Sequence, residues 1–290
     1  MLQSFLSYLI SEKRCSDHTV VAYKTDLNQF EEFAELSSQK DWLEVNHQLI
    51  RSWVVSLNTN QLTNKTINRK LSSIRAFYKW MQKQNLIDHN PCQNMKGPKV
   101  KKRLPQFVKE SELEIQFTGN DDDFEHVRDY LIIEMFYQTG IRLSELIELK
   151  DEEVRSNQIK VLGKRNKERI IPISKDLAKR IEDYRALRVA EMGSTDHFFV
   201  LKNSNKLYPK LVYRRINSYL GEVSNVDQKS PHILRHTFAT HMLNNGAGLE
   251  TLKELLGHAN LAATQVYTHN SFTQLANIYS QAHPRGHKKR

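Results

Sequence analysis

The chain has 290 residues, with 43 Lys or Arg against 33 Asp or Glu, and a formal net charge of +10. This length allows two domains, and 39% hydrophobic residues suffice for packed cores. No apolar run reaches the roughly 18 residues that span a bilayer, so the sequence excludes a membrane-spanning protein and predicts a soluble, cytoplasmic one. The positive net charge predicts a polyanionic partner. Two distant cysteines, Cys15 and Cys92, fit a reducing compartment better than a disulfide scaffold.

Residues 1–97 are predicted to form an all-helical domain. Apolar residues recur there at three-and-four spacing in four separate stretches, which is the pattern of amphipathic helices. Ser16 or Asp17 is expected to cap the second helix, and Thr63 or Asn64 the fourth. Four such helices make a small bundle. The predicted inward-facing residues are Leu2, Phe5, Leu6, Leu9, Val20, Tyr23, Leu27, Phe30, Ile50, Trp53, Val54, Leu57, Ile67, Leu71, Ile74, Tyr78 and Met81.

Basic side chains gather on the polar face of the fourth predicted helix, which carries Lys65, Arg69, Arg75 and Lys79. Lys24, on the second predicted helix, adds to the same surface. A charge run is usually a solvated helix face, but one with so few acids between the bases equally favours contact with phosphates. These five residues are therefore candidates for binding a DNA backbone.

Residues 98–105 are predicted to be a basic linker. The stretch begins and ends with proline, and it has no apolar period. Its cations include Lys101, Lys102 and Arg103, which could follow a DNA backbone while joining two domains. A plain solvated linker has the same pattern, so the sequence leaves both interpretations open.

The second domain is predicted to run over residues 106–290. A buried helix ends there at Thr139 and Gly140, and a new helix begins with Arg142. A helix N-terminus favours anions, so an arginine at this place suggests a ligand anion that the side chain and the helix end share. A surface ion pair with Glu145, three residues on, explains Arg142 equally well.

Alternating apolar residues predict a β-hairpin with strands at about 158–162 and 168–173. A lysine at the tip of such a turn, as Lys164 is, normally serves solubility. Four cations nevertheless lie in and beside the turn, namely Lys164, Arg165, Lys167 and Arg169. This concentration of positive charge favours insertion of the turn toward a phosphate.

The stretch 230–269 is predicted to hold a helix, a turn and a second short helix that ends at Gly257. Its leucines are expected to face a core. These are Leu249, Leu252, Leu255 and Leu256. The same stretch carries His232, Arg235, His258 and Tyr267, which together offer the cations, proton donors and nucleophile that a phosphodiester needs.

Each of these residues also has an ordinary structural explanation. A tyrosine such as Tyr267 is more often a half-buried core residue, and His258 after a glycine could cap a helix end. His232 and His236 have a spacing that suits a metal, but no acid or cysteine completes a site, so no metal is expected. Only the joint occurrence of all the residues argues for chemistry.

Four blocks occur in order, TGIRLSEL, VLGKRNKERIIP, HILRHTFATH and LGHANLAATQVYTH. With them the chain resembles the tyrosine recombinases, the integrase family, over nearly its whole length. The ending HPRGHKKR and the short amphipathic helix expected before it, at about 271–281, resemble the Xer branch. The resemblance does not separate its XerC and XerD types, or exclude a phage or transposon integrase of the same build.

The resemblance implies a mainly α fold with a small β-hairpin or sheet. It comprises an N-terminal helical core-binding domain of SAM-like type and a mixed α/β catalytic domain. It also implies strand cleavage and rejoining through a 3′-phosphotyrosyl intermediate, without a metal, ATP or other cofactor. The implied roles are phosphate binding for Arg142 and Arg235, hydrogen bonding and proton transfer for His232 and His258, general acid for Lys164, nucleophile for Tyr267 and support for Glu145.

The implied partner is double-stranded DNA with a specific inverted-repeat site. The implied assembly is a homo- or heterotetramer joined through the C-terminal helix, which would dock on a neighbouring protomer. A second Xer recombinase and an FtsK-like translocase would take part, in chromosome or plasmid dimer resolution linked to cell division. Two alternatives remain: a type IB topoisomerase-like enzyme that only relaxes DNA, and a DNA-binding protein without catalysis.

Overall fold

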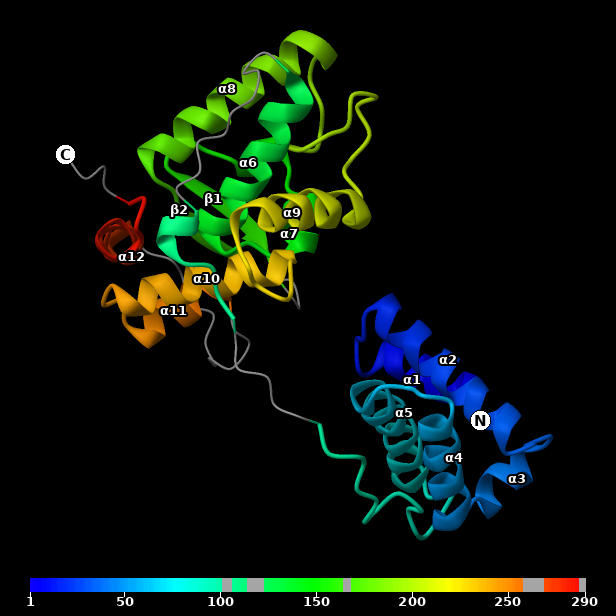
Figure 1. Ribbon diagram of the computed structural model, residues 1–290. Coiled ribbons are helices and arrows are strands. Elements are labelled where there is room, and N and C mark those ends of the chain that lie inside the picture. The colour runs from blue at the N-terminus through cyan, green and yellow to red at the C-terminus, as the bar shows by residue number, and fades with distance from the viewer. Residues whose placement is uncertain (101–105, 114–122, 164–167, 258–268, 287–290) are drawn as a thin grey trace. The chain divides into compact units, whose positions relative to one another are not determined.

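The computed structural model describes residues 1–100, 106–113, 123–163, 168–257 and 269–286, with side chains in the last range from 272 onward (Figure 1). The chain divides into two compact units, Met1–Arg103 and Leu104–Arg290. Within the described ranges, no helix combines the length and the apolar character that crossing a bilayer requires. The domain boundary at residue 97 and the linker at 98–105 remain predictions.

The N-terminal unit is a helical bundle. The longest helix, α5, follows Thr63, whose side-chain oxygen accepts a hydrogen bond from the backbone N–H of Thr66 at 3.3 Å. Its apolar side faces a core rich in aromatic rings, with Phe77 packed against Trp42 and Trp80. The helices are α1 (Leu2–Ser11), α2 (Asp17–Phe33), α3 (Gln39–Glu44), α4 (His47–Thr59) and α5 (Asn64–Lys83).

Residues 1–100 therefore form five helices where the sequence predicted four. The additional helix is α3, which begins with a capping box: Ser38 accepts from the N–H of Asp41 at 3.3 Å, and Asp41 accepts from the N–H of Ser38 at 2.7 Å. A helix of six residues is too short to show an apolar period, although the Ser-x-x-Asp spacing was visible.

The C-terminal unit is built around α6 (Phe124–Thr139), whose second half is buried on all sides. Helices α8, α9 and α10 pack against it, and the hairpin β1–β2 lies beside η2, α11 and α12 (Figure 1). Among the described residues, this mainly helical fold with a two-stranded sheet confirms the predicted fold class. The remaining elements are η1 (Glu110–Glu112), α7 (Leu143–Glu148), η2 (Asp151–Glu153), α8 (Lys175–Met192), α9 (Pro209–Val223), α10 (Pro231–Asn244), α11 (Leu249–Leu256) and α12 (His269–Ala282).

The hairpin joins β1 (Gln158–Leu162) to β2 (Glu168–Pro172) in an antiparallel register that pairs Val161 with Arg169. Alternate residues of a strand point to one face. The inner face therefore holds Ile159, Val161 and Ile171, and it holds Arg169 as well, with only 3% of its surface exposed. This parity, rather than any property of the turn, decides where the arginine points.

Helix α12 packs against α10 and β2 of its own chain, and Leu275 and Tyr279 are buried there. Beyond the helix, Arg285 forms an ion pair with the buried carboxylate of Glu134 and donates to the carbonyl of Leu113 at 2.8 Å. In this structure the chain itself covers the apolar stripe of α12. The resemblance implied docking on a neighbouring protomer instead.

Candidate active site

The site begins at the turn between α6 and α7. Gly140 ends α6 in the left-handed region, with φ of 60°, and a Cβ atom there would lie 2.6 Å from Phe238 and 2.9 Å from Leu256. Only glycine therefore lets α10 and α11 approach this turn so closely. Immediately after it, Arg142 precedes α7, and its backbone N–H donates to Glu145 Oε2 at 2.9 Å.

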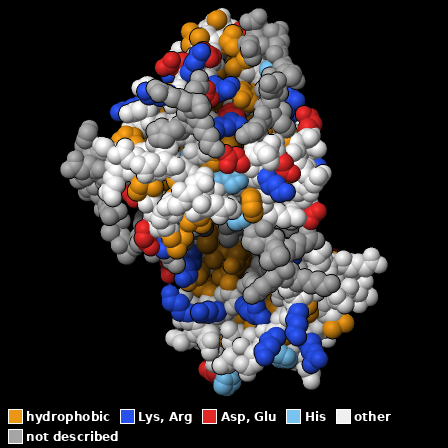
Figure 2. Space-filling model, turned by 60° about the vertical axis from the view of Figure 1, so that its left-hand side comes forward, with side chains coloured by type: hydrophobic (Ala, Val, Ile, Leu, Met, Phe, Trp, Pro, Cys, Tyr) orange, Lys and Arg blue, Asp and Glu red, His pale blue; other side chains and the backbone are white. Residues whose placement is uncertain are grey.

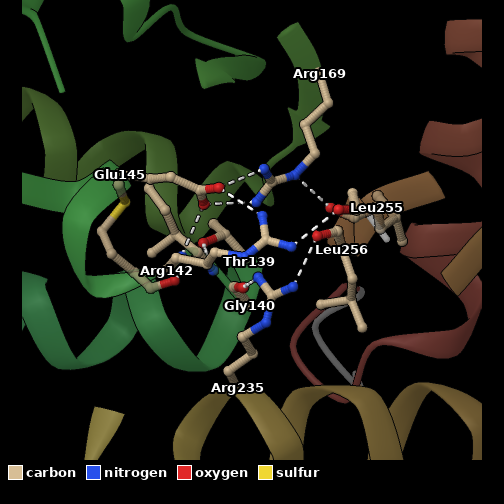
Figure 3. Close-up of polar contacts among 11 residues, drawn as sticks. Thr139, Gly140, Arg142, Glu145, Arg169, Arg235, Leu255 and Leu256 are labelled. Atoms are coloured by element: carbon tan, nitrogen blue, oxygen red, sulfur yellow. Dashed lines mark hydrogen bonds and ion pairs between the residues drawn. The ribbon is translucent and has the colours of Figure 1, made fainter. Parts of the chain in front are cut away.

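Glu145 is a buried carboxylate shared by two arginines (Figure 3). Its Oε1 accepts from Arg142 Nη1 at 2.6 Å, and its two oxygens accept from Arg169 Nη1 and Nη2, both at 2.8 Å. Burial raises the pKa of Glu145, but the hydrogen bonds and charge of Arg169, with those of Arg142, outweigh it and hold this pKa at about 2. The carboxylate thus stays ionised and orients both guanidiniums.

The C-terminal end of α11 lies on the other side of the arginines (Figure 3). Three successive carbonyls each accept from a different guanidinium. Arg169 Nε donates to Leu255 at 2.8 Å and Arg235 Nη2 to Leu256 at 2.7 Å. Arg142 Nη2 donates to Gly257 at 2.9 Å. Carbonyls at a helix end have no partner within the helix and carry its negative pole, so they suit cations.

Arg235 rises from the first turns of α10 and also donates to the carbonyl of Gly140. Burial lowers the pKa of its guanidinium, and the nearby charges of Arg142 and Arg169 lower it further, to about 9, against the opposite pull of Glu145. Arg142, Arg169, Arg235 and Glu145 form an arginine cluster. Among its described side chains, three cations face one anion. The environment therefore favours an additional anion beside Arg235.

The structure brings together three residues that the sequence singled out, Arg142, Arg235 and Glu145. The ion pair between Arg142 and Glu145, considered as a surface contact, is in fact largely buried: 29% of the arginine side chain and 4% of the glutamate side chain are exposed. His232 lies on the first turn of α10, three residues before Arg235, and is exposed. Lys164, His258 and Tyr267 lie outside the described residues.

Two expectations within this region are wrong. Arg169 was counted among the cations that favour insertion of the hairpin turn toward a phosphate, but it faces inward from β2 and binds Glu145 and Leu255. The alternation of the strand could have revealed this, because Arg169 lies two residues before Ile171 and therefore on the same face of β2. Leu249 was expected in the core but is 58% exposed, because it lies at the first position of α11, at the edge of the packed surface.

The predicted DNA-binding residues of the N-terminal unit divide into two groups. Arg69 pairs with the buried Asp26 of α2, and Arg75 donates to the carbonyl of Met95, so both are held by their own unit. Lys24, Lys65 and Lys79 are exposed, and Figure 2 shows Lys and Arg side chains gathered on this unit. Lys101, Lys102 and Arg103 are outside the part of the chain that the structure describes.

Replacing Glu145 by Gln is expected to destabilise the C-terminal unit by about 3 kcal/mol at pH 7, because it leaves a buried guanidinium without its counter-charge. The carboxyl's pKa is about 2 in the fold and 4.5 ordinarily. The stability that the ionised carboxylate of Glu145 gives the fold is therefore fully present above pH 4.5 and is lost as the pH falls toward 2. Urea unfolding of both proteins from pH 7 to pH 2.5 should show the difference shrinking in that window.

Far-UV circular dichroism would follow this unfolding, and tryptophan fluorescence gives an internal control. All three tryptophans, Trp42, Trp53 and Trp80, lie in the N-terminal unit and should report an unchanged transition. A matched variant is Glu148→Gln, on the same helix but with 60% of its side chain exposed, which should shift stability by less than about 0.5 kcal/mol. An equal loss in both variants would contradict the structural role of Glu145.

Comparison with known protein families gives matches along most of the chain. A model described as "Phage integrase family" matches residues 106–274, and one described as "Phage integrase, N-terminal SAM-like domain" matches residues 2–85. The first contains the whole arginine cluster and the positions of Lys164, His232, His258 and Tyr267.

Among curated proteins, the tyrosine recombinase XerC of Staphylococcus epidermidis is 40% identical over 292 residues, which covers 99% of this chain and 98% of that protein. The tyrosine recombinase XerC of Pseudomonas syringae pv. tomato is 33% identical over 291 residues, covering 99% and 97%. Both relatives span both units of the chain.

Two solved structures share the fold. The XerH site-specific recombinase bound to a palindromic difH substrate, a post-cleavage complex, has a TM-score of 0.69 at 20% identity, covering 96% of this chain and 83% of that one. The Tn1549 transposon integrase in complex with transposon right end DNA has a TM-score of 0.68 at 19% identity, covering 95% and 98%. At these identities the likeness shows the architecture alone.

Proposed function

Since this chain belongs to the phage integrase family, the tyrosine recombinases, we propose that its arginine cluster binds the scissile phosphate of a DNA strand and that Tyr267 attacks it. The chain is a site-specific recombinase, an enzyme that cleaves and rejoins DNA. The assignment of individual residues to steps of that reaction is the part proposed here.

One observation carries the assignment, namely the surplus of cationic donors in the cluster. A guanidinium has five N–H donors. Among the described residues, the side chains of Arg142 and Arg235 each use two of them. Donors remain on both for the non-bridging oxygens of a phosphate, which a planar guanidinium binds in pairs. Such an anion would also offset the burial and the charges of Arg142 and Arg169 that lower the pKa of Arg235.

The proposed cleavage step forms one bond and breaks another. The phenol of Tyr267 passes its proton to the imidazole of His232 or His258 as its oxygen attacks the phosphorus, and the bond to the 5′ oxygen breaks as that oxygen takes a proton from Lys164. Arg142 and Arg235 stabilise the charge on the non-bridging oxygens, with hydrogen bonds from His232 and His258. The 3′-phosphotyrosyl product is again a phosphodiester, so rejoining needs no ATP.

For the biological role, we propose Xer-type resolution of chromosome or plasmid dimers, because relatives that match nearly the whole chain are named XerC. The reaction would take place in the cytoplasm on an inverted-repeat site, within a tetramer of one or two recombinases. In that assembly α12 would exchange between neighbouring protomers. An FtsK-like translocase would activate the assembled recombinase. Phage or transposon integration is the alternative role.

A supercoiled plasmid with two directly repeated copies of the cognate site tests the proposal. Footprinting on DNA from the source genome would first locate that site. A resolvase converts the plasmid into two smaller circles, whereas a topoisomerase-like enzyme yields only relaxed circles of the original length. Relaxation without exchange, with or without an added XerD-type recombinase, would overturn the proposed role.

We further propose that Lys65 and Lys79 on α5 contact the DNA backbone. Both are exposed, and they lie within one sector of the helix face opposite the buried Ile67 and Ile74. Removing a phosphate contact weakens binding and lowers the slope of log affinity against log salt by about 0.9 per contact. The double variant Lys65→Ala/Lys79→Ala is thus expected to lower the slope by about 2.

Fluorescence anisotropy with labelled cognate DNA at several salt concentrations measures this slope. Lys40→Ala provides the control, because Lys40 is an exposed lysine on α3, outside the basic face, and pairs only with Glu44 among the described residues. An unchanged slope in the double variant would place the DNA on a different face of the unit.

A further inference from the structure

We propose that Arg169 is a positioning residue of the active site, which sets the end of α11 relative to the Glu145–Arg142 pair. The inference rests on the proposed function, because it gives Arg169 a part in the same cleavage reaction. Arg169 is 3% exposed and points inward from β2. A guanidinium so buried acts through the groups that it holds and not on the DNA itself.

Arg169 joins three elements through one rigid planar group. Its two Nη atoms bind both oxygens of Glu145 on α7, and its Nε binds the carbonyl of Leu255 near the end of α11, all three at 2.8 Å (Figure 3). The fork geometry of a guanidinium fixes both partners at once. Because Glu145 in turn holds Arg142, displacement of Arg169 would move the proposed phosphate-binding side chain as well.

The close approach of Gly257 gives a second, independent observation. This residue ends α11 with φ of 63°, and a Cβ atom there would lie 3.1 Å from Arg169 Cδ and 3.2 Å from Nη1. The carbonyl of Gly257 also accepts from Arg142. In the sequence Gly257 directly precedes His258, so the proposed catalytic histidine follows a residue that Arg142 binds and that lies beside Arg169.

Arg169→Lys tests the proposal, since a single ammonium cannot reproduce the three directed bonds. Arg188→Lys is the matched control, because Arg188 is 1% exposed and binds Asp151 and the carbonyl of Phe198, both at 2.8 Å, away from the cluster. Cleavage of a nicked suicide substrate would be followed in single turnover at saturating DNA. A positioning defect lowers the rate constant at full amplitude, whereas loss of folded protein lowers the amplitude.

The expected result for Arg169→Lys is a rate constant lower by about 10- to 100-fold, because small misplacements of reacting groups have effects of that size. DNA affinity should change by less than about 3-fold, and Arg188→Lys should retain the wild-type rate constant. A wild-type rate constant in Arg169→Lys, or an equal decrease in both variants, would overturn the inference. If the wild-type protein itself forms no adduct, the proposed function fails instead.

Gly257→Ala examines the same contact without changing any charge, and it serves if Arg169→Lys folds poorly. Its control is Gly246→Ala, since Gly246 has φ of 87° and a Cβ atom there would have no other atom within 4 Å. Both changes strain the backbone, but only the first presses on Arg169. A slower rate constant in Gly257→Ala alone is expected, and an equal effect in both variants would contradict the inference.

Discussion

Tyr267→Phe is expected to abolish the covalent adduct between this protein and a nicked suicide substrate, a loss of about 10⁴-fold or more. The variant lacks the one oxygen that we propose becomes part of the phosphotyrosyl bond, and no adjustment of the remaining side chains would replace it. Affinity for cognate DNA should stay within about 2-fold, because the arginine cluster and the exposed lysines of α5, Lys65 and Lys79, are unchanged. The adduct is measured by denaturing gel electrophoresis, after which mass spectrometry of the digested product locates the modified residue.

Tyr213→Phe is the matched control for this experiment. Tyr213 lies on α9 with 47% of its surface exposed, so loss of its hydroxyl should leave adduct formation at the wild-type level. Persistence of the adduct in Tyr267→Phe, or a peptide map that places the DNA on another residue, would show that a different nucleophile performs the reaction.

Arg235→Lys is expected to slow cleavage by about 10²- to 10³-fold, the effect typical of losing one donor to developing negative charge. The guanidinium bridges the carbonyls of Gly140 and Leu256 while keeping donors for a phosphate, whereas an ammonium cannot hold all of these partners. The surroundings also lower the pKa of the arginine from 12.5 to about 9. The same burial and neighbouring cations would lower the pKa of a lysine at this position, so it would lose its charge more readily than a lysine in water.

The pH dependence makes this prediction specific. Because protonation restores the charge of the lysine, the rate of the variant relative to the wild type should rise as the pH falls from about 8.5 to 6. Single-turnover cleavage at several pH values measures that ratio. Arg180→Lys, on α8 and outside the cluster, is the control and should follow the wild type throughout. A pH-independent ratio would mean that Arg235 acts by shape alone.

Local patterns explain why much of the fold could be predicted. The apolar period of α5, the alternation in β1 and β2, and the glycines that end α6 and α11 each depend on residues only a few positions apart. The helix α3 was missed because six residues are too few for a period. The blocks that carry the resemblance are also local. Arg142 and Glu145 of the first block lie together in the fold with Arg169 of the second and Arg235 of the third.

Contacts between distant segments could not be predicted in this way. Arg69 looked available for DNA because no acid is near it in the sequence, yet Asp26, 43 residues away, pairs with it. The stripe of α12 looked in need of a partner, yet α10 and β2 of the same chain cover it in this structure.

By itself the sequence determined most of the helices and both strands, which residue types are available for phosphate chemistry, and to which family the chain belongs. Only the tertiary structure decided how the charges are shared. Arg169 reaches Glu145 over 24 residues and Leu255 over 86, so neither contact leaves a periodic trace in the chain. The physical reason is that a buried carboxylate takes whichever cations the packing places beside it, and packing joins residues without regard to their separation in sequence.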